Sequence, residues 1–366
     1  MKITHIQSQV VVLPGEEPLA GGPASPKDTK NFVTLRIGTD AGIEGLGVTF
    51  FGGALTGTLK SAVDELGALT IGEDPLRIEA IVHKLRTAAG NSAGPGGIFT
   101  LALSAIDIAL WDIKGKAFNL PLARLLGGYR DRVPTYASGA LMRGFPLDHT
   151  VRAAKTLVDK GFRQMKTQLA LPGDTNPARE IDHIRRVREA VGPEIDLMCD
   201  INQRWGVHQA IDIGSRIADV GLFWLEDVTT HDDYQGLARV TKALSTPVAG
   251  GEYVYGIAPF RQMMEAGSVD IVMIDVLRAG GITQWMKIAG MAEAFNLPVV
   301  NHLYPEVSVH LVSAIPHGLT VEYMPWSLKL YKQGPAIEKG QLVVPDRPGL
   351  GLEFDPDTLA RYGVRG

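Results

Sequence analysis

The chain has 366 residues and a formal net charge of -4, from 36 basic and 40 acidic side chains, with no basic block. This composition excludes the electrostatic footprint of a protein that binds nucleic acid or anionic lipid. Hydrophobic residues make up 45% of the chain, which excludes general disorder, and no stretch approaches the roughly eighteen apolar residues of a membrane span. One cysteine and a start without a signal-peptide pattern predict a cytoplasmic protein, and we expect a small-molecule partner.

Residues 1–128 predict a small α+β capping domain. Apolar runs separated by turns come first, and an unbroken apolar helix is expected over 99–118, where it would pack between two domains. The stretch 15–31 is rich in Gly, Pro and charge and predicts a loop, which is either a plain surface connection or a lid over a site. We expect the Pro- and Gly-punctuated segment from about 325 to 366 to return to this cap and complete it.

Residues 129–324 predict a barrel in which parallel strands alternate with helices. Eight short apolar or β-branched runs alternate with amphipathic stretches of helical spacing. An open, doubly wound sheet is the alternative fold, but no GxGxxG motif follows the first strand. The predicted strands are residues 134–139, 162–168, 194–200, 222–227, 247–252, 269–275, 298–302 and 319–323.

Polar side chains stand at the ends of these strands, where the catalytic groups of such barrels lie. The strand-end residues are Lys166, Gln168, Asp200, Asn202, Glu226, Glu252, Asp275, His302 and Glu322. Among them, Asp200, Glu226 and Glu252 follow one another at intervals of 26 residues, one βα unit each. We therefore expect these three carboxylates side by side on neighbouring strands.

Three converging carboxylates repel one another unless a cation lies between them. All-oxygen ligands without Cys or His favour Mg²⁺, with Mn²⁺ as the other option, over zinc or copper. The alternative for a single acid of this kind is a cap on a helix N-terminus. The sequence predicts a metal site formed by Asp200, Glu226 and Glu252.

Asp275 and His302 end adjacent predicted strands. A carboxylate beside an imidazole fixes its tautomer and raises its basicity, as a general base near neutral pH requires. Lys166 and Gln168 are two residues apart, so both side chains should point into the barrel. We expect Lys166 to pair either with a substrate carboxylate or with one of the metal-ligand acids.

The candidates for binding the rest of the substrate come from the cap loop and the early barrel loops. They are Lys27, Lys30, Arg143, Gln168, Asn202 and Arg204. For the charged members of this set the alternative is an ordinary solvated side chain.

Taken in order, these motifs resemble the enolase superfamily, and in particular its mandelate racemase subgroup, over nearly the whole chain. AIDIALWDIKGKAFNLPLARLLGG (105–128) looks like that family's passage from cap to barrel, and MCDINQRW, WLED and AGGE look like its three metal-ligand strands. IDVLRAGGIT, NHLYPEVSVHL and VEYMPW look like the strands that bear its Asp-His dyad and final glutamate. The resemblance implies an α/β fold, with an α+β capping domain over a modified (β/α)7β TIM barrel. It also implies Mg²⁺ on the three acids and, by analogy, a homo-oligomer.

The resemblance further implies a shared first step, in which a base removes the proton α to a carboxylate to give an enediolate stabilised by the metal. His302 with Asp275 is the expected base. Glu322 is placed to hydrogen-bond the other carboxylate oxygen of the substrate, a role that suits a protonated acid.

One departure from the family pattern shapes the predicted reaction. The second strand of the barrel often carries Lys-x-Lys, but here it reads Lys166-Thr167-Gln168, and position 202 is Asn where some family dehydratases have His. A site with one base suits β-elimination of water. We therefore expect an acid-sugar dehydratase, a carbon-oxygen hydro-lyase that makes a 2-keto-3-deoxy acid. The alternatives are a racemase, epimerase or cycloisomerase of a hydroxy or lactone acid that uses Lys166 as a second base, and, more remotely, a noncatalytic ligand-binding barrel.

Overall fold

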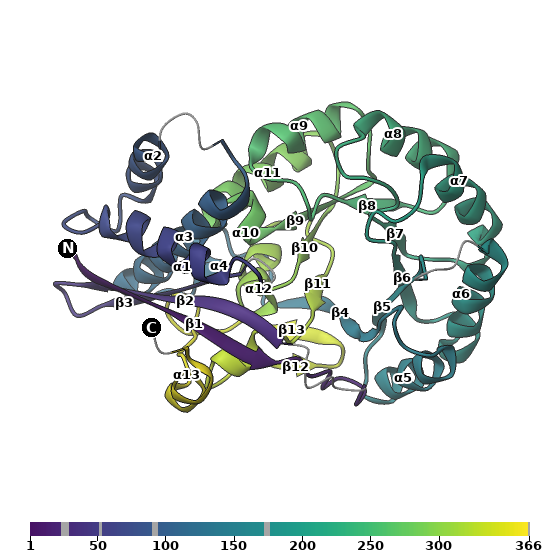
Figure 1. Ribbon diagram of the computed structural model, residues 1–366, viewed down its shortest axis with the longest axis horizontal. Coiled ribbons are helices and arrows are strands. Elements are labelled where there is room, and N and C mark those ends of the chain that lie inside the picture. The colour runs from purple at the N-terminus through teal and green to yellow at the C-terminus, as the bar shows by residue number, and fades with distance from the viewer. Residues whose placement is uncertain (23–28, 51–52, 90–93, 172–175, 365–366) are drawn as a thin grey trace.

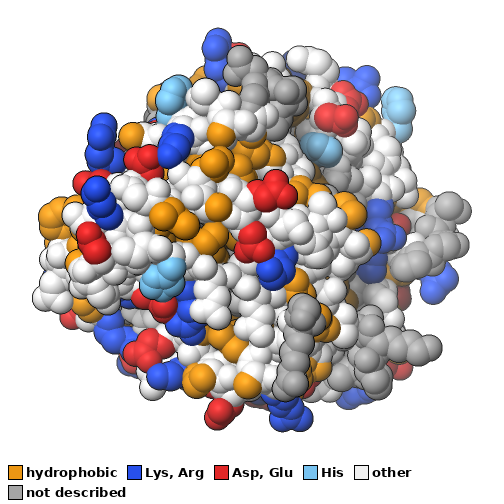
Figure 2. All heavy atoms as spheres, turned by 60° about the vertical axis from the view of Figure 1, so that its left-hand side comes forward, with side chains coloured by type: hydrophobic (Ala, Val, Ile, Leu, Met, Phe, Trp, Pro, Cys, Tyr) orange, Lys and Arg blue, Asp and Glu red, His pale blue; other side chains and the backbone are white. Residues whose placement is uncertain are grey.

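The computed structural model describes residues 1–22, 29–50, 53–89, 94–171 and 176–364. Its larger part is a ring of strands surrounded by helices, and a smaller unit built from the N-terminal residues lies at one side (Figure 1). Within the described ranges, no helix has both the length and the apolar character needed to cross a membrane. On the face that the N-terminal unit presents, hydrophobic side chains are interspersed with charges of both signs (Figure 2), so no basic surface forms there.

The N-terminal unit is a three-stranded antiparallel sheet covered by helices. Glycines in its third strand allow close packing of the long apolar helix: a Cβ atom at Gly45 or Gly47 would lie 2.1 Å from a backbone oxygen of that helix. The strands, in the order β1-β2-β3, are β1 (Ile3–Pro14), β2 (Thr29–Thr39) and β3 (Glu44–Thr49). The helices are α1 (Thr56–Ala68), α2 (Ile78–Ala88), α3 (Gly97–Phe118) and the short α4 (Leu122–Leu125).

The barrel is a ring of eight parallel strands: seven of the predicted runs each contain one of them, and the run 134–139 lies within the first, β4. Neighbouring strands pair in sequence order, and the last of them, β11, pairs with the first, β4. A parallel bridge between Val299 and Gly318 closes the remaining gap between β10 and β11. The strands are β4 (Arg132–Leu141), β5 (Gln164–Gln168), β6 (Asp196–Asp200), β7 (Trp224–Glu226), β8 (Val248–Gly250), β9 (Ile271–Asp275), β10 (Val299–His302) and β11 (Val321–Tyr323).

Helices follow the strands and cover the outside of the ring (Figure 1). They are α5 (Leu147–Asp159), α6 (Pro177–Val191), α7 (Val207–Arg216), the 3-10 turn η1 (Ala218–Val220), α8 (Tyr234–Ala243), α9 (Ile257–Glu265), α10 (Val276–Ala279), α11 (Ile282–Ala294) and α12 (Pro305–Ala314). The prediction of a barrel of βα units is confirmed, and the open doubly wound alternative is wrong.

The C-terminal segment runs back from the barrel to the N-terminal unit. A hairpin of β12 (Ile337–Glu338) and β13 (Gln341–Val343) pairs with β4, after the 3-10 turn η2 (Leu328–Leu330). Beyond α13 (Pro356–Tyr362), the N–H of Val364 donates to the Val10 carbonyl at 2.8 Å. Val364, the last described residue, therefore lies against the first strand.

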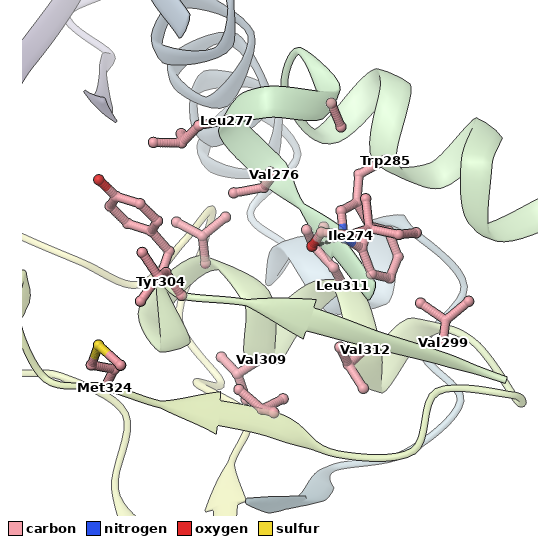
Figure 3. Close-up of a cluster of buried hydrophobic side chains, with 14 of the residues drawn as sticks. Ile274, Val276, Leu277, Trp285, Val299, Tyr304, Val309, Leu311, Val312 and Met324 are labelled. Carbon is pink, nitrogen blue, oxygen red and sulfur yellow. Dashed lines mark hydrogen bonds between the residues drawn. The ribbon is translucent and has the colours of Figure 1, made fainter. Parts of the chain in front are cut away.

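Side chains fill the barrel beneath the strand ends, so the ring is a packed core and not a pore. Tyr136 and Trp224 meet edge to face inside it, with ring centroids 5.4 Å apart. Outside the ring, Ile274 and Trp285 belong to a buried apolar cluster between β9, β10 and the helices that follow them (Figure 3). Because side chains alternate along β9, burying Ile274 in this cluster turns Asp275 toward the barrel interior.

The helix α3 also fixes the N-terminal unit to the barrel. The Asp107 carboxylate accepts hydrogen bonds from the N–H and the hydroxyl of Thr283 on α11, at 3.0 and 2.5 Å. The Trp111 indole N–H donates to the same hydroxyl at 2.9 Å. Burial outweighs these hydrogen bonds and raises the pKa of Asp107 to about 6.

This raised pKa predicts a pH-dependent contribution to stability. Below pH 6 the folded chain binds a proton at Asp107. The unfolded chain has an ordinary aspartate there and stays deprotonated until a lower pH. The contribution of Asp107 to the free energy of unfolding therefore rises as the pH falls. Between pH 7.5 and 4.5 the gain is about 2 kcal/mol. Asp107→Asn does not titrate and should lack this gain when unfolding free energies are measured in urea at both pH values. The exposed-site variant Asp159→Asn should follow the wild type, and an equal gain in Asp107→Asn would contradict the assignment.

Candidate active site

A cavity of about 420 Å³ lies at the carboxyl ends of the barrel strands. Its walls contain Lys166, Asp200, Glu252, His302 and Glu322, so most of the predicted strand-end residues meet in one place. Each of these five side chains is buried. The arrangement follows from the parallel strands, whose carboxyl ends all open on the same side of the barrel.

Three carboxylates form a compact group at the ends of β6 and β7. Asp200, Glu226 and Asp227 each offer an oxygen within 4.8 Å of the others. Burial raises the pKa of all three groups, and repulsion from neighbouring carboxylates adds to the effect. Buried, crowded carboxylates with hard oxygen donors fit a divalent cation such as Mg²⁺.

Glu252, the third acid of the predicted metal site, lines the same cavity. It follows β8, and its Oε2 atom is 3.5 Å from Nε2 of His302. The Arg278 guanidinium donates to its backbone carbonyl at 2.9 Å and thereby fixes the turn. Glu252 thus contacts the histidine, and its charge also raises the pKa of Asp200 and Asp227.

Lys166 is the central cation of the site. Its Nζ atom is 2.5 Å from Oε1 of Glu226 and 2.9 Å from Oε1 of Glu322. Burial opposes its charge, but these two carboxylates outweigh the burial and hold the pKa of Lys166 well above its usual range. Of the two expected partners, the structure pairs it with the site's own acids.

The surroundings of Glu322 favour its ionised form over the protonated acid that the sequence suggested. Burial favours the neutral acid, but the charges of Lys166 and His302 and a 2.7 Å hydrogen bond from the Leu303 N–H outweigh it. The pKa of Glu322 is consequently lowered, and the side chain is a carboxylate. The sequence placed Glu322 at the right strand end but did not show that Lys166 would reach it.

Asp275 and His302 form a hydrogen-bonded dyad. Nδ1 of His302 lies 2.6 Å from Oδ2 of Asp275, whose other oxygen accepts the N–H groups of Leu277 and Arg278. Burial raises the pKa of Asp275, but the hydrogen bond from His302 and the charges of Arg278 and His302 outweigh burial and lower it, so Asp275 is ionised. An ionised acceptor keeps the proton on Nδ1 and leaves Nε2 as the basic atom that faces the cavity. Burial lowers the pKa of His302, but Glu252 and Asp275 outweigh it and raise the pKa overall.

Arg143, Gln168 and Asn202 form one polar network beside Asp200. The Gln168 amide donates to Asp200 at 3.2 Å and to Asn202 at 3.1 Å, and the Arg143 guanidinium donates to Asn202 at 2.6 Å. Asn202 is in the left-handed region, with φ of 47°, and its N–H donates to Asp200 at 2.8 Å. The three predicted substrate-binding residues therefore lie together, beside the cluster of carboxylates that contains Asp200.

A second cavity, of about 370 Å³, adjoins the first. The two share Arg143, Gln168, Asn202, Arg204 and Trp326 as lining residues. The loop after β1 contributes its outer wall through Glu16 and Glu17, and the Lys30 ammonium lies 3.7 Å from the centre of the Trp326 ring. Lys27, the remaining predicted contact, lies outside the described residues. Part of the segment predicted as a loop or lid therefore borders the site.

Several residues of the site were not predicted. Trp224 donates its indole N–H to Oε2 of Glu226 at 2.9 Å, and Arg278 approaches Asp275 at 3.6 Å. Asp227 stands directly after Glu226, where strand alternation predicts an outward side chain, but its φ of 45° turns it inward. The adjacent acids of WLED were the one available signal for Asp227.

Comparison with known proteins agrees with this geometry. Residues 15–127 match the family model of the mandelate racemase / muconate lactonizing enzyme N-terminal domain, and residues 149–358 match the enolase C-terminal domain-like model. A 3,6-anhydro-alpha-L-galactonate cycloisomerase of Streptomyces coelicolor is 34% identical over 91% of both chains. An L-talarate/galactarate dehydratase of Salmonella typhimurium is 32% identical over 96% of this chain and 88% of its own.

Solved structures show the same likeness. L-talarate dehydratase from Polaromonas sp. JS666, complexed with Mg and L-glucarate, superposes with a TM-score of 0.91 at 31% identity, over 100% of this chain and 98% of that one. A racemase from Streptomyces coelicolor A3(2) with bound magnesium has the same TM-score and identity, over 99% and 100%. With both family models matched and relatives aligned along nearly its whole length, the chain belongs to the enolase superfamily, in its mandelate racemase subgroup.

Proposed function

We propose that this protein is a Mg²⁺-dependent acid-sugar dehydratase that converts a polyhydroxy acid into a 2-keto-3-deoxy acid. The observation that carries the proposal is the oriented His302–Asp275 dyad. It shares one cavity with the cluster of buried acids. On β5, where the family pattern often has a second basic residue, this chain has Gln168. The dehydratases among its relatives support the same reaction.

Asp200, Glu226 and Glu252 are the proposed holders of the cation. When bound, Mg²⁺ supplies positive charge that offsets the negative charge developing on the substrate carboxylate. Mn²⁺ is the proposed substitute, because it accepts the same oxygen donors. Trp224 and Lys166 each occupy one oxygen of Glu226 and so fix the orientation of that carboxylate.

His302 carries the proton in both halves of the proposed reaction. Nε2 takes the proton from the carbon α to the carboxylate, and the C–H electrons form the enediolate. The imidazolium, held by Asp275, then gives this proton to the hydroxyl on the β-carbon, whose C–O bond breaks to release water. The resulting enol becomes the 2-keto acid. A positioned base of this kind contributes about 10²–10⁴-fold to the rate.

The geometry favours this single-base reaction over racemisation with Lys166. The Lys166 ammonium lies between two carboxylates, at 2.5 and 2.9 Å, and therefore keeps its proton. Its proposed role is to balance the charge of Glu226 and Glu322. A noncatalytic barrel would not require the buried, oriented dyad, which argues against that alternative.

A cycloisomerase is the second candidate, and the relative at 34% identity with that name favours it. If the oxygen on the β-carbon belongs to a ring, the same α-proton removal opens the ring in place of releasing water. His302 would then protonate the ring oxygen. The product has the mass of its substrate, whereas dehydration removes one water, so mass spectrometry separates the two functions.

The first test combines His302→Asn with incubation in D₂O. The wild type, loaded with Mg²⁺, should convert members of an aldonic and aldaric acid library into keto acids. His302→Asn should lose at least 10²-fold in kcat, because no other oriented base remains, while its Mg²⁺ affinity stays within a few fold. Substantial dehydration by the variant would show that another residue is the base. Deuterium in unreacted or epimerised substrate, without keto acid, would replace the dehydratase with a racemase or epimerase.

A second prediction concerns Gln168, whose side chain lines the same cavity as His302. Gln168→Lys restores a basic residue at this position, and we expect it to introduce α-deuterium into recovered substrate in D₂O, measured by NMR. Gln168→Ala is the matched control: it removes the amide without adding a base and should show no exchange and only a mild loss of kcat. A collapse of kcat in Gln168→Ala would mean that the amide does more than position the substrate.

A further inference from the structure

Asp227 is a buried carboxylate to which the proposed reaction assigns no role. Its backbone is fixed on both sides, because its N–H donates to Ala249 at 3.0 Å and its carbonyl accepts the Gln203 N–H at 2.7 Å. The left-handed φ of 45° turns its side chain into the barrel, where only 3% of the residue is exposed. The structure thus holds a fourth acid against Asp200 and Glu226.

The carboxylate oxygens of Asp200 and Glu226 all have hydrogen-bond donors. Those of Asp200 accept the Asn202 N–H and the Gln168 amide, and those of Glu226 accept the Lys166 ammonium and the Trp224 indole. Oδ2 of Asp227 is buried and has no hydrogen-bond partner within the described part of the chain. An unpaired buried carboxylate oxygen is costly, so this atom requires a positive partner that the protein itself does not supply.

We propose that Asp227 is a fourth carboxylate of the metal centre, and that its charge and free oxygen raise the affinity of the site for Mg²⁺. The inference rests on the metal centre of the proposed function and adds a residue to it. The 4.8 Å grouping of Asp227 with Asp200 and Glu226 places its carboxylate within reach of a cation held by those acids. Asp227 takes no part in proton transfer, which belongs to His302.

Calorimetric titration of metal-free protein with MgCl₂ tests the proposal directly. Asp227→Asn preserves the shape of the side chain and removes its charge, and the Kd for Mg²⁺ should rise about 10- to 100-fold, as for other groups that support metal ligands. Asp219→Asn is the matched control, since it removes the same charge from an exposed residue paired with Arg185. Its Kd should equal that of the wild type. A Kd within twofold of the wild type in Asp227→Asn would overturn the proposal.

A second variant and a second measurement guard against a folding defect. Asp227→Ser is smaller and also neutral, and the rise in Tm that Mg²⁺ gives the wild type should shrink in either Asp227 variant that folds. An undiminished rise would refute the role of Asp227.

Asp200→Asn separates this inference from the proposed function. If Asp200→Asn abolishes binding and the Asp227 variants do not, only the Asp227 inference fails, whereas a wild type that binds no Mg²⁺ overturns both.

Discussion

The dominant constraint on this molecule is the burial of several carboxylates at one end of a barrel. Asp200, Glu226, Glu252 and Glu322 all line or adjoin the same cavity, and burying their charge is unfavourable unless positive groups lie among them. Lys166 is the positive group that the chain places there, in contact with two of the acids. The remaining negative charge is the physical reason for the site's fit to a divalent cation. The packed interior below, where Tyr136 meets Trp224, keeps the acids at the rim.

Acids in two different ionisation environments lie close together in this site. Asp275 stays ionised because hydrogen bonds and Arg278 surround it, whereas burial and mutual repulsion raise the pKa of Asp200, Glu226 and Asp227. His302 lies between these environments and contacts both Asp275 and Glu252. Asp275 thus orients the histidine, and the charge of Glu252 also acts on it. In the proposed reaction, the substrate decides the outcome: a free hydroxyl on the β-carbon is released as water, whereas a ring oxygen there leads to ring opening.

Much of this architecture follows from the sequence. Eight apolar runs predicted the eight strands, and the rule that barrels react at their strand ends located Lys166 and His302. The rule of alternating side chains failed where the backbone becomes left-handed, as at Asp227, because a single φ reverses which face a residue occupies. The sequence suggested that Lys166 could pair with a metal-ligand acid, but nothing local to β5 indicates that Lys166 also contacts Glu322. The lowered pKa of Glu322 was therefore not foreseen.

The loop after β1 is held in place without help from the catalytic groups. The Glu17 carboxylate accepts three backbone N–H groups of its own loop, and Glu16 forms an ion pair with Lys329, which follows β11. The described residues of this loop border the outer cavity but form no hydrogen bond or ion pair with Asp200, Glu226, Asp227 or the His302 dyad. The loop wall of the outer cavity and the residues that orient His302 are therefore separable by mutation.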